Sequence, residues 1–256
     1  MIDSRAIIDS TARLANGVTI GSFSVIGPDV EIGEDTWIGP HVVINGPSRI
    51  GRQNKIFQFA SVGDIPQDKK YSGEASRLEI GDRNVIREFC TINRGTEQGG
   101  GVTRIGNDNW IMAYVHIAHD CIIGNSVIFS NAASLAGHVT VDDHAILGGF
   151  TLVHQFCAIG ANCFTAMGSV IPKDVPPYIM VSGHMARPFG LNAEGLKRRG
   201  FSAETLVNLR RAYKILYKSG LTVEQAKEKL RELVDVCPEA NLFIEFLGKS
   251  TRGIVR

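Results

Sequence analysis

The chain has 256 residues and a formal net charge of +1, with 44% hydrophobic and 21% charged residues. This composition is typical of a globular protein and excludes a disordered or collagen-like chain. A net charge so close to zero gives no support to nucleic-acid binding through bulk electrostatics. No apolar stretch reaches the roughly 18 residues of a membrane span, and the first residues lack the apolar core of a signal peptide. We therefore expect a cytoplasmic protein without a membrane span.

A six-residue repeat dominates most of the chain. An aliphatic residue recurs at every sixth position from Ile8 through Val62. Residues 64–79 and 95–104 interrupt this rhythm, which otherwise continues to Ile171 with Thr165 as its one polar member. A period of six matches neither an α-helix nor a simple alternating strand. It does fit a parallel β-helix, in which each hexapeptide supplies one short strand and one corner.

A second column of small or β-branched residues lies four positions after each aliphatic residue. We expect both columns to point into the β-helix. The second column contains four of the five cysteines, namely Cys90, Cys121, Cys157 and Cys163. These thiols are therefore expected to be buried small hydrophobes and not catalytic nucleophiles. The odd cysteine number and the absence of a Cys-x-x-Cys pair indicate reduced thiols, as in the cytosol.

Helical signals replace the repeat after Pro188. Ser202 can cap a helix that runs to about Lys218, and Thr222 opens a capping box for a second helix that ends before Pro238. A third short helix is expected over 240–247. We thus predict a β-helix domain over 1–187, with loop insertions at about 64–79 and 95–104. A small α-helical domain follows over 188–256.

The two predicted domains differ in charge. From residue 188 onward the chain carries 13 Lys+Arg and 8 Asp+Glu, a net of +5. The preceding residues carry 14 Lys+Arg and 18 Asp+Glu, a net of −4. The helical end is therefore a basic appendage on a slightly acidic β-helix.

The segment from 114 to 124 concentrates candidate catalytic side chains. His119 follows an inward aliphatic residue by two positions, near a corner from which a side chain projects outward. Gly137 lies 18 residues further on, and in a β-helix with three hexapeptides per coil it stacks on His119. A histidine that accepts a hydroxyl proton and a glycine N–H that binds an oxyanion are the groups that acyl transfer needs. Asp120 could orient the imidazole. From the residues alone, a metal ligand, a substrate contact or a plain surface histidine remain open.

The repeat resembles the left-handed β-helix of the hexapeptide-repeat acyltransferases, an all-β triangular prism. Six segments further resemble the members of that family that acylate UDP-N-acetylglucosamine. They are IAHDC (117–121), LAGHV (135–139), VHQF (153–156), QDKKY (67–71), GLKRRGFS (195–202) and STRG (250–253). The resemblance extends over the whole chain. It implies transfer of a 3-hydroxyacyl chain from acyl carrier protein to the glucosamine 3-hydroxyl, the first step of lipid A biosynthesis.

The resemblance also implies roles for individual residues. His119 would be the general base, Asp120 its support, and Gly137 the oxyanion donor. Met167 stands where relatives that accept long acyl chains have a glycine. The larger side chain implies an acyl groove for roughly ten carbons, because a chain with methylenes that do not fit is discriminated against. In the segment TINRG, Asn93 stands where the resemblance leads us to expect a histidine. Any substrate contact that this histidine makes in relatives therefore differs here. The implied substrate-binding residues are Asp68, Lys70, His116, His138, His154, Gln155, Asn192, Glu194, Arg198 and Arg199.

The same resemblance implies a homotrimer and an acyl donor that is the phosphopantetheine thioester of acyl carrier protein, with no other cofactor and no metal. Three alternatives stay open. A coenzyme A-dependent acetyltransferase of this fold would not need the basic helical domain. A zinc carbonic anhydrase of this fold would need three histidines that converge between subunits, which His116, His119 and His138 could supply. A non-catalytic scaffold would not need so many outward histidines.

Overall fold

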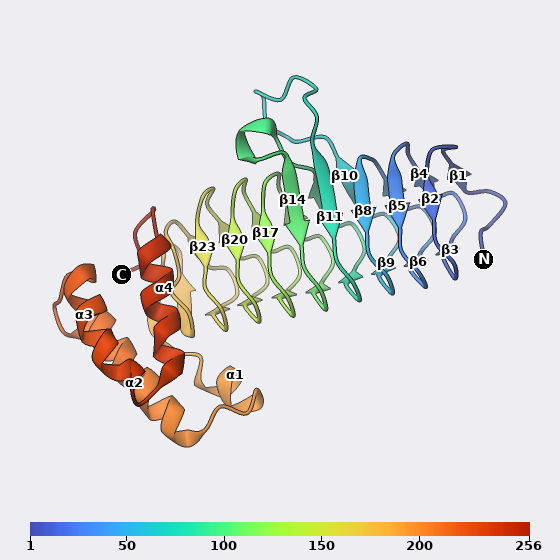
Figure 1. Ribbon diagram of the computed structural model, residues 1–256. Helices are drawn as coiled ribbons and strands as arrows, with labels where there is room; N and C mark the ends of the chain where they lie inside the picture. Colours follow the sequence, from blue (N-terminus) through green and yellow to red (C-terminus); the bar gives the residue numbers. More distant parts are fainter.

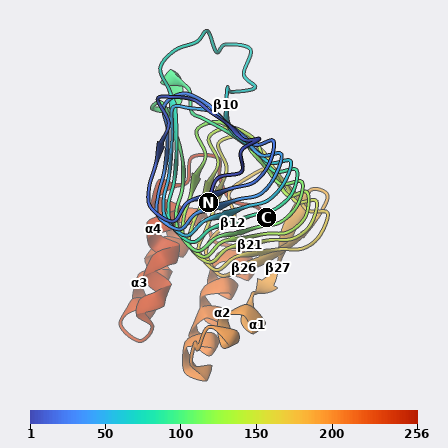
Figure 2. The same cartoon turned by 90° about the vertical axis from the view of Figure 1, so that its right-hand side faces the viewer.

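Short strands wind into three long sheets that enclose a triangular prism (Figures 1 and 2). The computed structural model describes residues 1–256. Most strands contain two residues because each hexapeptide uses its remaining residues for a corner. Strands one coil apart pair in parallel, and their partners are 18 residues apart outside the insertions, as between Ile117 and Leu135. The parallel β-helix predicted from the repeat is confirmed.

The nine strands of the first sheet are β1 (Ile7–Ile8), β4 (Val25–Ile26), β7 (Val43–Ile44), β10 (Ser61–Asp64), β13 (Thr91–Asn93), β16 (His116–Ile117), β19 (Ser134–Leu135), β22 (Leu152–Val153) and β25 (Val170–Ile171). The eight strands of the second sheet are β2 (Arg13–Leu14), β5 (Val30–Ile32), β8 (Ser48–Ile50), β11 (Arg77–Ile80), β14 (Val102–Ile105), β17 (Ile122–Ile123), β20 (Thr140–Val141) and β23 (Ala158–Ile159). The ten strands of the third sheet are β3 (Thr19–Ile20), β6 (Trp37–Ile38), β9 (Lys55–Ile56), β12 (Val85–Ile86), β15 (Trp110–Ile111), β18 (Ile128–Phe129), β21 (Ile146–Leu147), β24 (Phe164–Thr165), β26 (Ile179–Gly183) and β27 (Ala186–Leu191).

The interior of the prism is filled by the two predicted columns. The aliphatic residues from Ile20 to Ile171 are buried, and so are the four cysteines of the second column. Burial raises the pKa of the Cys90 and Cys121 thiols to about 12, so these thiols are not nucleophiles at neutral pH. Three inward asparagines stack as a hydrogen-bonded ladder, which satisfies their amides inside the core: Asn54, Asn84 and Asn109.

Both insertions leave the prism at the corner between the first and second sheets. The first forms a loop over 65–76 between β10 and β11, and the second contains the short 3-10 helix η1 (Glu97–Gly99) between β13 and β14. Figure 1 shows them side by side above the prism. They widen the coil spacing from 18 residues to 30 between Val62 and Ile92, and to 25 between Ile92 and Ile117.

Four α-helices follow the prism: α1 (Ala193–Arg198), α2 (Ala203–Lys218), α3 (Val223–Val234) and α4 (Asn241–Lys249), with the 3-10 helix η2 (Pro238–Ala240) before α4. The predicted caps are confirmed, because Ser202 accepts from Thr205 N and Thr222 forms a capping box with Gln225. None of the helices combines the length and the apolar character needed to cross a bilayer.

The junction between the two parts differs from expectation. The predicted boundary after residue 187 falls inside β27, and the helix α1 was not predicted at all. Although the six-residue repeat stops near Pro176, β26 continues the third sheet beside β24, and β27 returns antiparallel to β26. This hairpin covers the last strand edge of the third sheet, which would otherwise offer unpaired backbone groups.

Candidate active site

His119 and Asp120 form a hydrogen-bonded pair at the corner between β16 and β17. Their Nδ1 and Oδ2 atoms are 2.8 Å apart. Neighbouring side chains in a strand point to opposite faces, but Asp120 has a φ of 60°, in the left-handed region. This corner conformation turns the carboxylate toward the preceding imidazole. The pairing is therefore a property of the corner and not of the strand.

The second insertion holds the Asp120 carboxylate in place. The Thr96 N–H donates to Oδ1 at 2.8 Å and the Thr96 hydroxyl donates to Oδ2 at 2.6 Å. Burial alone would raise the pKa of Asp120, but the hydrogen bonds from His119 and Thr96 outweigh burial and lower it. An ionised Asp120 fixes the tautomer of His119 with the proton on Nδ1. The lone pair of His119 Nε2 is then available as a base.

Gly137 lies directly against the His119 ring. A Cβ atom at this position would come within 2.5 Å of Cε1 and 2.7 Å of Nε2. The absence of a side chain therefore lets the backbone approach the imidazole. No protein acceptor takes the Gly137 N–H, whereas the neighbouring His138 N–H donates to His119 O at 3.0 Å. A free amide beside the basic nitrogen of a histidine can bind an oxyanion.

Two further histidines flank this pair. His138 lies with Nε2 3.7 Å from Asp120 Oδ2, and its ring stacks on Phe156 with the ring centroids 4.4 Å apart. Burial lowers the pKa of His138 although the Asp120 carboxylate acts in the opposite direction. His116 places Nδ1 2.7 Å from the Thr91 hydroxyl, and burial, together with the charge of His119, lowers its pKa. Both imidazoles are thus suited to hydrogen bonding as neutral groups.

Four more predicted residues lie around this corner. Gln155 is one coil beyond Gly137, and His154 places Nδ1 3.1 Å from Gln155 O and 3.2 Å from Arg252 Nη2 of the STRG segment. Asp68 and Lys70 belong to the 65–76 loop, where the Lys70 N–H donates to Asp68 Oδ1 at 3.0 Å. The Asp68 carboxylate is close enough to favour the protonated form of His138.

The remaining nucleotide candidates are not part of this corner within one chain. Asn192 caps α1, Glu194 pairs with Lys197 on it, and Arg198 and Arg199 end it. Figures 1 and 2 show α1 on the opposite side of the prism from the 65–76 loop. Met167 also lies elsewhere, at the corner between the third and first sheets, with 77% of its surface exposed.

The cluster of His119, Asp120 and His138 has the donor set of a metal site, since one ligand atom from each lies within 4.8 Å of the others. The nearest pair is already joined by a hydrogen bond, which a metal ion would have to break. His116 is not in this group, and its Nδ1 contacts the Thr91 hydroxyl instead. Within one chain this group thus contains two histidines and not three, and a carbonic anhydrase site of this fold would have to be completed between subunits.

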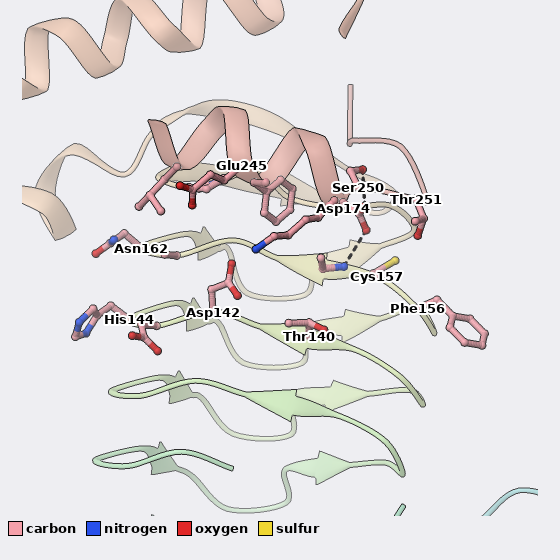
Figure 3. Close-up of a pocket in the computed structure, with 17 residues that line it drawn as sticks. Thr140, Asp142, His144, Phe156, Cys157, Asn162, Asp174, Glu245, Ser250 and Thr251 are labelled. Atoms are coloured by element: carbon pink, nitrogen blue, oxygen red, sulfur yellow. Dashed lines mark hydrogen bonds between the residues drawn. The ribbon is translucent and has the colours of Figure 1, made fainter. Parts of the chain in front are cut away.

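A cavity of about 710 Å³ lies between the second sheet and α4 (Figure 3). Phe156 and His144 stand at its two ends, with Asp142 between them, and Lys249 of α4 also lines it. Burial and the neighbouring Asp143 raise the pKa of Asp142. His119 does not line this cavity; its side chain is 14% exposed at the corner between the first and second sheets.

Two threonines that were not predicted from the sequence, Thr96 and Thr103, hold Asp120. Thr103 accepts from the Asp120 N–H at 2.8 Å, and both threonines are buried. Thr96 lies in the second insertion and Thr103 in the strand β14 that follows it, and both fall within 95–104, where the six-residue repeat is interrupted. The only feature of the sequence that could have indicated their role is the length of the insertion, which is enough for it to fold back over the His119–Asp120 pair.

Comparisons with known proteins match this arrangement. A family model described as Udp N-acetylglucosamine O-acyltransferase, Domain 2, matches residues 174–255, and a model of bacterial transferase hexapeptide repeats matches residues 103–137. The acyl-[acyl-carrier-protein]–UDP-N-acetylglucosamine O-acyltransferase of Thiobacillus denitrificans is 58% identical over 255 residues, which cover 100% of this chain and 99% of that protein. The protein of the same name from Herminiimonas arsenicoxydans is 53% identical over 260 residues, with coverage of 100% and 99%.

The chain belongs to the UDP-N-acetylglucosamine O-acyltransferase family. The solved UDP-N-acetylglucosamine acyltransferase of Francisella novicida superposes with a TM-score of 0.98 at 45% identity, covering 100% of this chain and 94% of that one. Membership of this family confirms the left-handed parallel β-helix with a helical C-terminal domain, and it makes the chain an acyltransferase.

Proposed function

We propose that this chain transfers a 3-hydroxyacyl group from acyl carrier protein to the glucosamine 3-hydroxyl of UDP-N-acetylglucosamine, the first step of lipid A biosynthesis. The observation that carries the proposal is the arrangement of His119, Asp120 and Gly137. One free basic nitrogen, one fixed carboxylate and one free backbone N–H meet at a single point. The names of the relatives supply the donor and the acceptor.

The proposed reaction uses these groups in two steps. His119 Nε2 takes the proton of the sugar 3-hydroxyl while its oxygen attacks the thioester carbonyl. The Gly137 N–H binds the oxyanion of the tetrahedral intermediate, and the Asp120 carboxylate stabilises the imidazolium. The intermediate then collapses to the ester and expels the phosphopantetheine thiolate, which receives the proton from His119. Asp120 stays ionised throughout.

For the sugar nucleotide we propose contacts to the residues around the corner: Asp68, Lys70, His116, His138, His154 and Gln155. Arg198 and Arg199 suit the pyrophosphate because a guanidinium offers paired donors. With Asn192 and Glu194, they lie away from His119 in their own chain. We therefore propose that a neighbouring copy supplies them, which makes the active site incomplete in a monomer and requires the homotrimer.

An exposed aromatic column supports this assembly. Phe23, Phe59, Phe89 and Tyr114 follow one corner of the prism, with His41 between the first two, and each stacks on the next at 4.9–5.4 Å. These four rings are 44–60% exposed in the single chain. A continuous apolar stripe of this kind marks a surface that another protein covers. We propose that it faces the other two copies.

For the donor, we propose acyl carrier protein and no further cofactor. The helical domain has a net charge of +5, and none of Arg198, Arg199, Arg210 and Arg211 pairs with a carboxylate. Such a surface suits an acidic carrier. We place the reaction in the cytoplasm, since all five cysteines are free and buried, as expected in a reducing compartment.

The deciding experiment is an acyl-transfer assay with 3-hydroxyacyl thioesters of varied length, each offered on acyl carrier protein and on coenzyme A. We expect a 3-O-acyl product by mass spectrometry, a strong preference for the carrier protein, and loss of product with His119→Ala. Static light scattering should give a trimer. Equal use of coenzyme A thioesters would favour the alternative acetyltransferase. No transfer by the wild-type trimer would overturn the proposal.

A further inference from the structure

Three consecutive residues after the start of β13 fasten the 65–76 loop to the prism. Asn93 Nδ2 donates to Ile65 O at 2.7 Å, where the loop begins. The Arg94 N–H donates to Asp64 O at 3.0 Å, and the Gly95 N–H donates to Arg77 O at 3.2 Å, where the loop ends. Both ends of the loop are thus held by one short segment of the next coil.

The Arg94 side chain reaches the middle of the same loop. Nη2 donates to the Tyr71 hydroxyl at 3.2 Å, and the guanidinium lies over the Tyr71 ring, 6.0 Å from its centroid. Nη1 donates to Gly46 O at 2.9 Å and to Gly63 O at 3.2 Å, both on neighbouring coils. One planar group therefore joins the loop to two points of the rigid prism.

The partners of Arg94 are unusual for an arginine. All of them are neutral, no carboxylate lies within ion-pairing distance, and its Nε is buried without a partner. A half-buried cation without a counter-ion is costly to keep unless its hydrogen bonds hold something in place. Here they hold a loop whose own residues are mostly exposed and which has few buried anchors.

Within the loop, Tyr71 links Arg94 to the residues proposed to bind substrate. The Tyr71 N–H donates to Asp68 O at 3.0 Å, and Asp68 in turn accepts from the Lys70 N–H. The Tyr71 hydroxyl also donates to Glu74 O at 3.3 Å, on the far side of the loop. Fixing Tyr71 thereby fixes the turn that carries Asp68 and Lys70.

We propose that Arg94 is a positioning residue for the sugar nucleotide: through Tyr71 it holds the 65–76 loop in the form in which Lys70 and Asp68 can reach the bound UDP-N-acetylglucosamine. This inference rests on the proposed function of the loop residues. Arg94 itself need not touch substrate. Without it, the loop occupies its binding position only part of the time, and apparent affinity falls by that fraction.

The test combines kinetics with a measurement that needs no substrate. Arg94→Gln should raise the KM for UDP-N-acetylglucosamine by about tenfold, the size of one lost charged hydrogen bond, with kcat within about twofold of wild type. Tyr71→Phe should give a smaller shift in the same direction. Hydrogen exchange should show lost protection of the amides of residues 65–76 in both variants. Arg104→Gln is the matched control, because Arg104 pairs with Glu79 on the neighbouring strand and makes no hydrogen bond to the loop.

Two further variants separate this role from the alternatives. In a Lys70→Ala background, Arg94→Gln should change KM by no more than about twofold to threefold, because the contact that it positions is already gone. Arg94→Lys keeps the charge but not the planar set of donors, and it should fall between wild type and Arg94→Gln. A wild-type KM for Arg94→Lys would mean that charge alone matters and would overturn the proposal.

Two other outcomes would also overturn the proposal. One is an equal effect of Arg94→Gln on KM in the wild-type and Lys70→Ala backgrounds, and the other is unchanged hydrogen-exchange protection of residues 65–76. Because the exchange measurement needs no substrate, it tests the contact even if the acyl-transfer assay fails. A wild-type enzyme without acyl transfer but with Arg94-dependent protection of the loop would contradict the proposed function. It would still support the role of Arg94 in holding the 65–76 loop.

Discussion

The Gly137 backbone lies so close to the His119 imidazole that a single added carbon would come within 2.5 Å of Cε1. This contact joins two coils of the prism, since the two residues are 18 apart in the chain and adjacent in space. It places a free backbone N–H beside a free basic nitrogen. Glycine is required here by the approach of the ring and not by an unusual φ angle.

We therefore predict that Gly137→Ala lowers kcat by about 10²–10³-fold, because the new methyl displaces His119 and disturbs the oxyanion donor. The far-UV circular dichroism spectrum and the trimer should be unchanged. Gly248→Ala is the matched control, since nothing lies within 4 Å of the position its Cβ would take. A Gly137→Ala enzyme with wild-type kcat would show that the contact has no part in the reaction.

Removal of the base should be at least as severe. His119→Ala should lower kcat by about 10²–10⁴-fold or more, as for other general bases, without loss of fold, because His119 is not part of the hydrophobic core. Asp120→Asn should also lower kcat, since an amide cannot accept from His119 and from both Thr96 donors as the carboxylate does. Single-turnover rates measure both effects. Activity near wild type in His119→Ala would refute the assignment.

Acidification should destabilise the protein in a defined window. Burial lowers the pKa of His116, His138 and His144 below the ordinary value of 6.5, so the unfolded chain binds protons more readily than the folded one. Stability is therefore greatest above that value and is lost as pH falls from about 6.5 toward the lower folded pKa values. The midpoint of thermal unfolding, measured from about pH 7.5 to about pH 5.5, should fall.

Replacing one of these histidines should reduce that fall. His144→Gln removes one of these half-buried imidazoles and lies outside the active-site corner, whereas His184→Gln replaces an exposed histidine and serves as control. The His144→Gln protein should lose less of its thermal midpoint on acidification than either wild type or the control. Identical pH profiles for all three would contradict the linkage.

Acyl-chain length is proposed to depend on Met167. Its side chain is 77% exposed at a corner other than that of His119, so it could line an acyl groove only between two copies of the chain. A methionine there should end the groove about four methylenes sooner than a glycine, and each excluded methylene should be worth roughly 1–3 kcal/mol of discrimination. Met167→Gly should move the preferred chain from about ten carbons toward fourteen, in competition assays with mixed thioesters. An unchanged length optimum would mean that Met167 only packs between subunits.

Binding of the acyl carrier protein should depend on the basic surface of the helical domain. Arg198, Arg199, Arg210 and Arg211 are all exposed, and none forms an ion pair. Reversing the charge of Arg210 and Arg211 to Glu should raise the KM for the acyl carrier thioester, more at low salt than at high salt. The Arg198→Glu and Arg199→Glu variants should in addition weaken sugar-nucleotide binding. A carrier KM that responds to neither reversal nor ionic strength would exclude this electrostatic contact.

The sequence alone determined the prism, because an exact period is a local property that every coil repeats. The six-residue spacing from Ile8 to Ile171 predicted the inward residues, four cysteines among them. Together with the three hexapeptides per coil that the family resemblance implied, it also predicted that Gly137 stacks on His119. The caps at Ser202 and Thr222 were equally local, and the structure has the helices that they begin. The repeat predicts nothing outside the residues that conform to it, and so the β26–β27 hairpin and α1 were not predicted.

Only the tertiary structure decided how the corner works. The turn of Asp120 toward His119 depends on a left-handed φ, and its fixation by Thr96 and Thr103 depends on how the second insertion folds back. The hydrogen bond from Arg94 to Tyr71 joins two coils, and the first insertion interrupts the six-residue spacing between them. Such contacts follow from the path of irregular loops over a rigid surface, and no spacing in the sequence encodes that path.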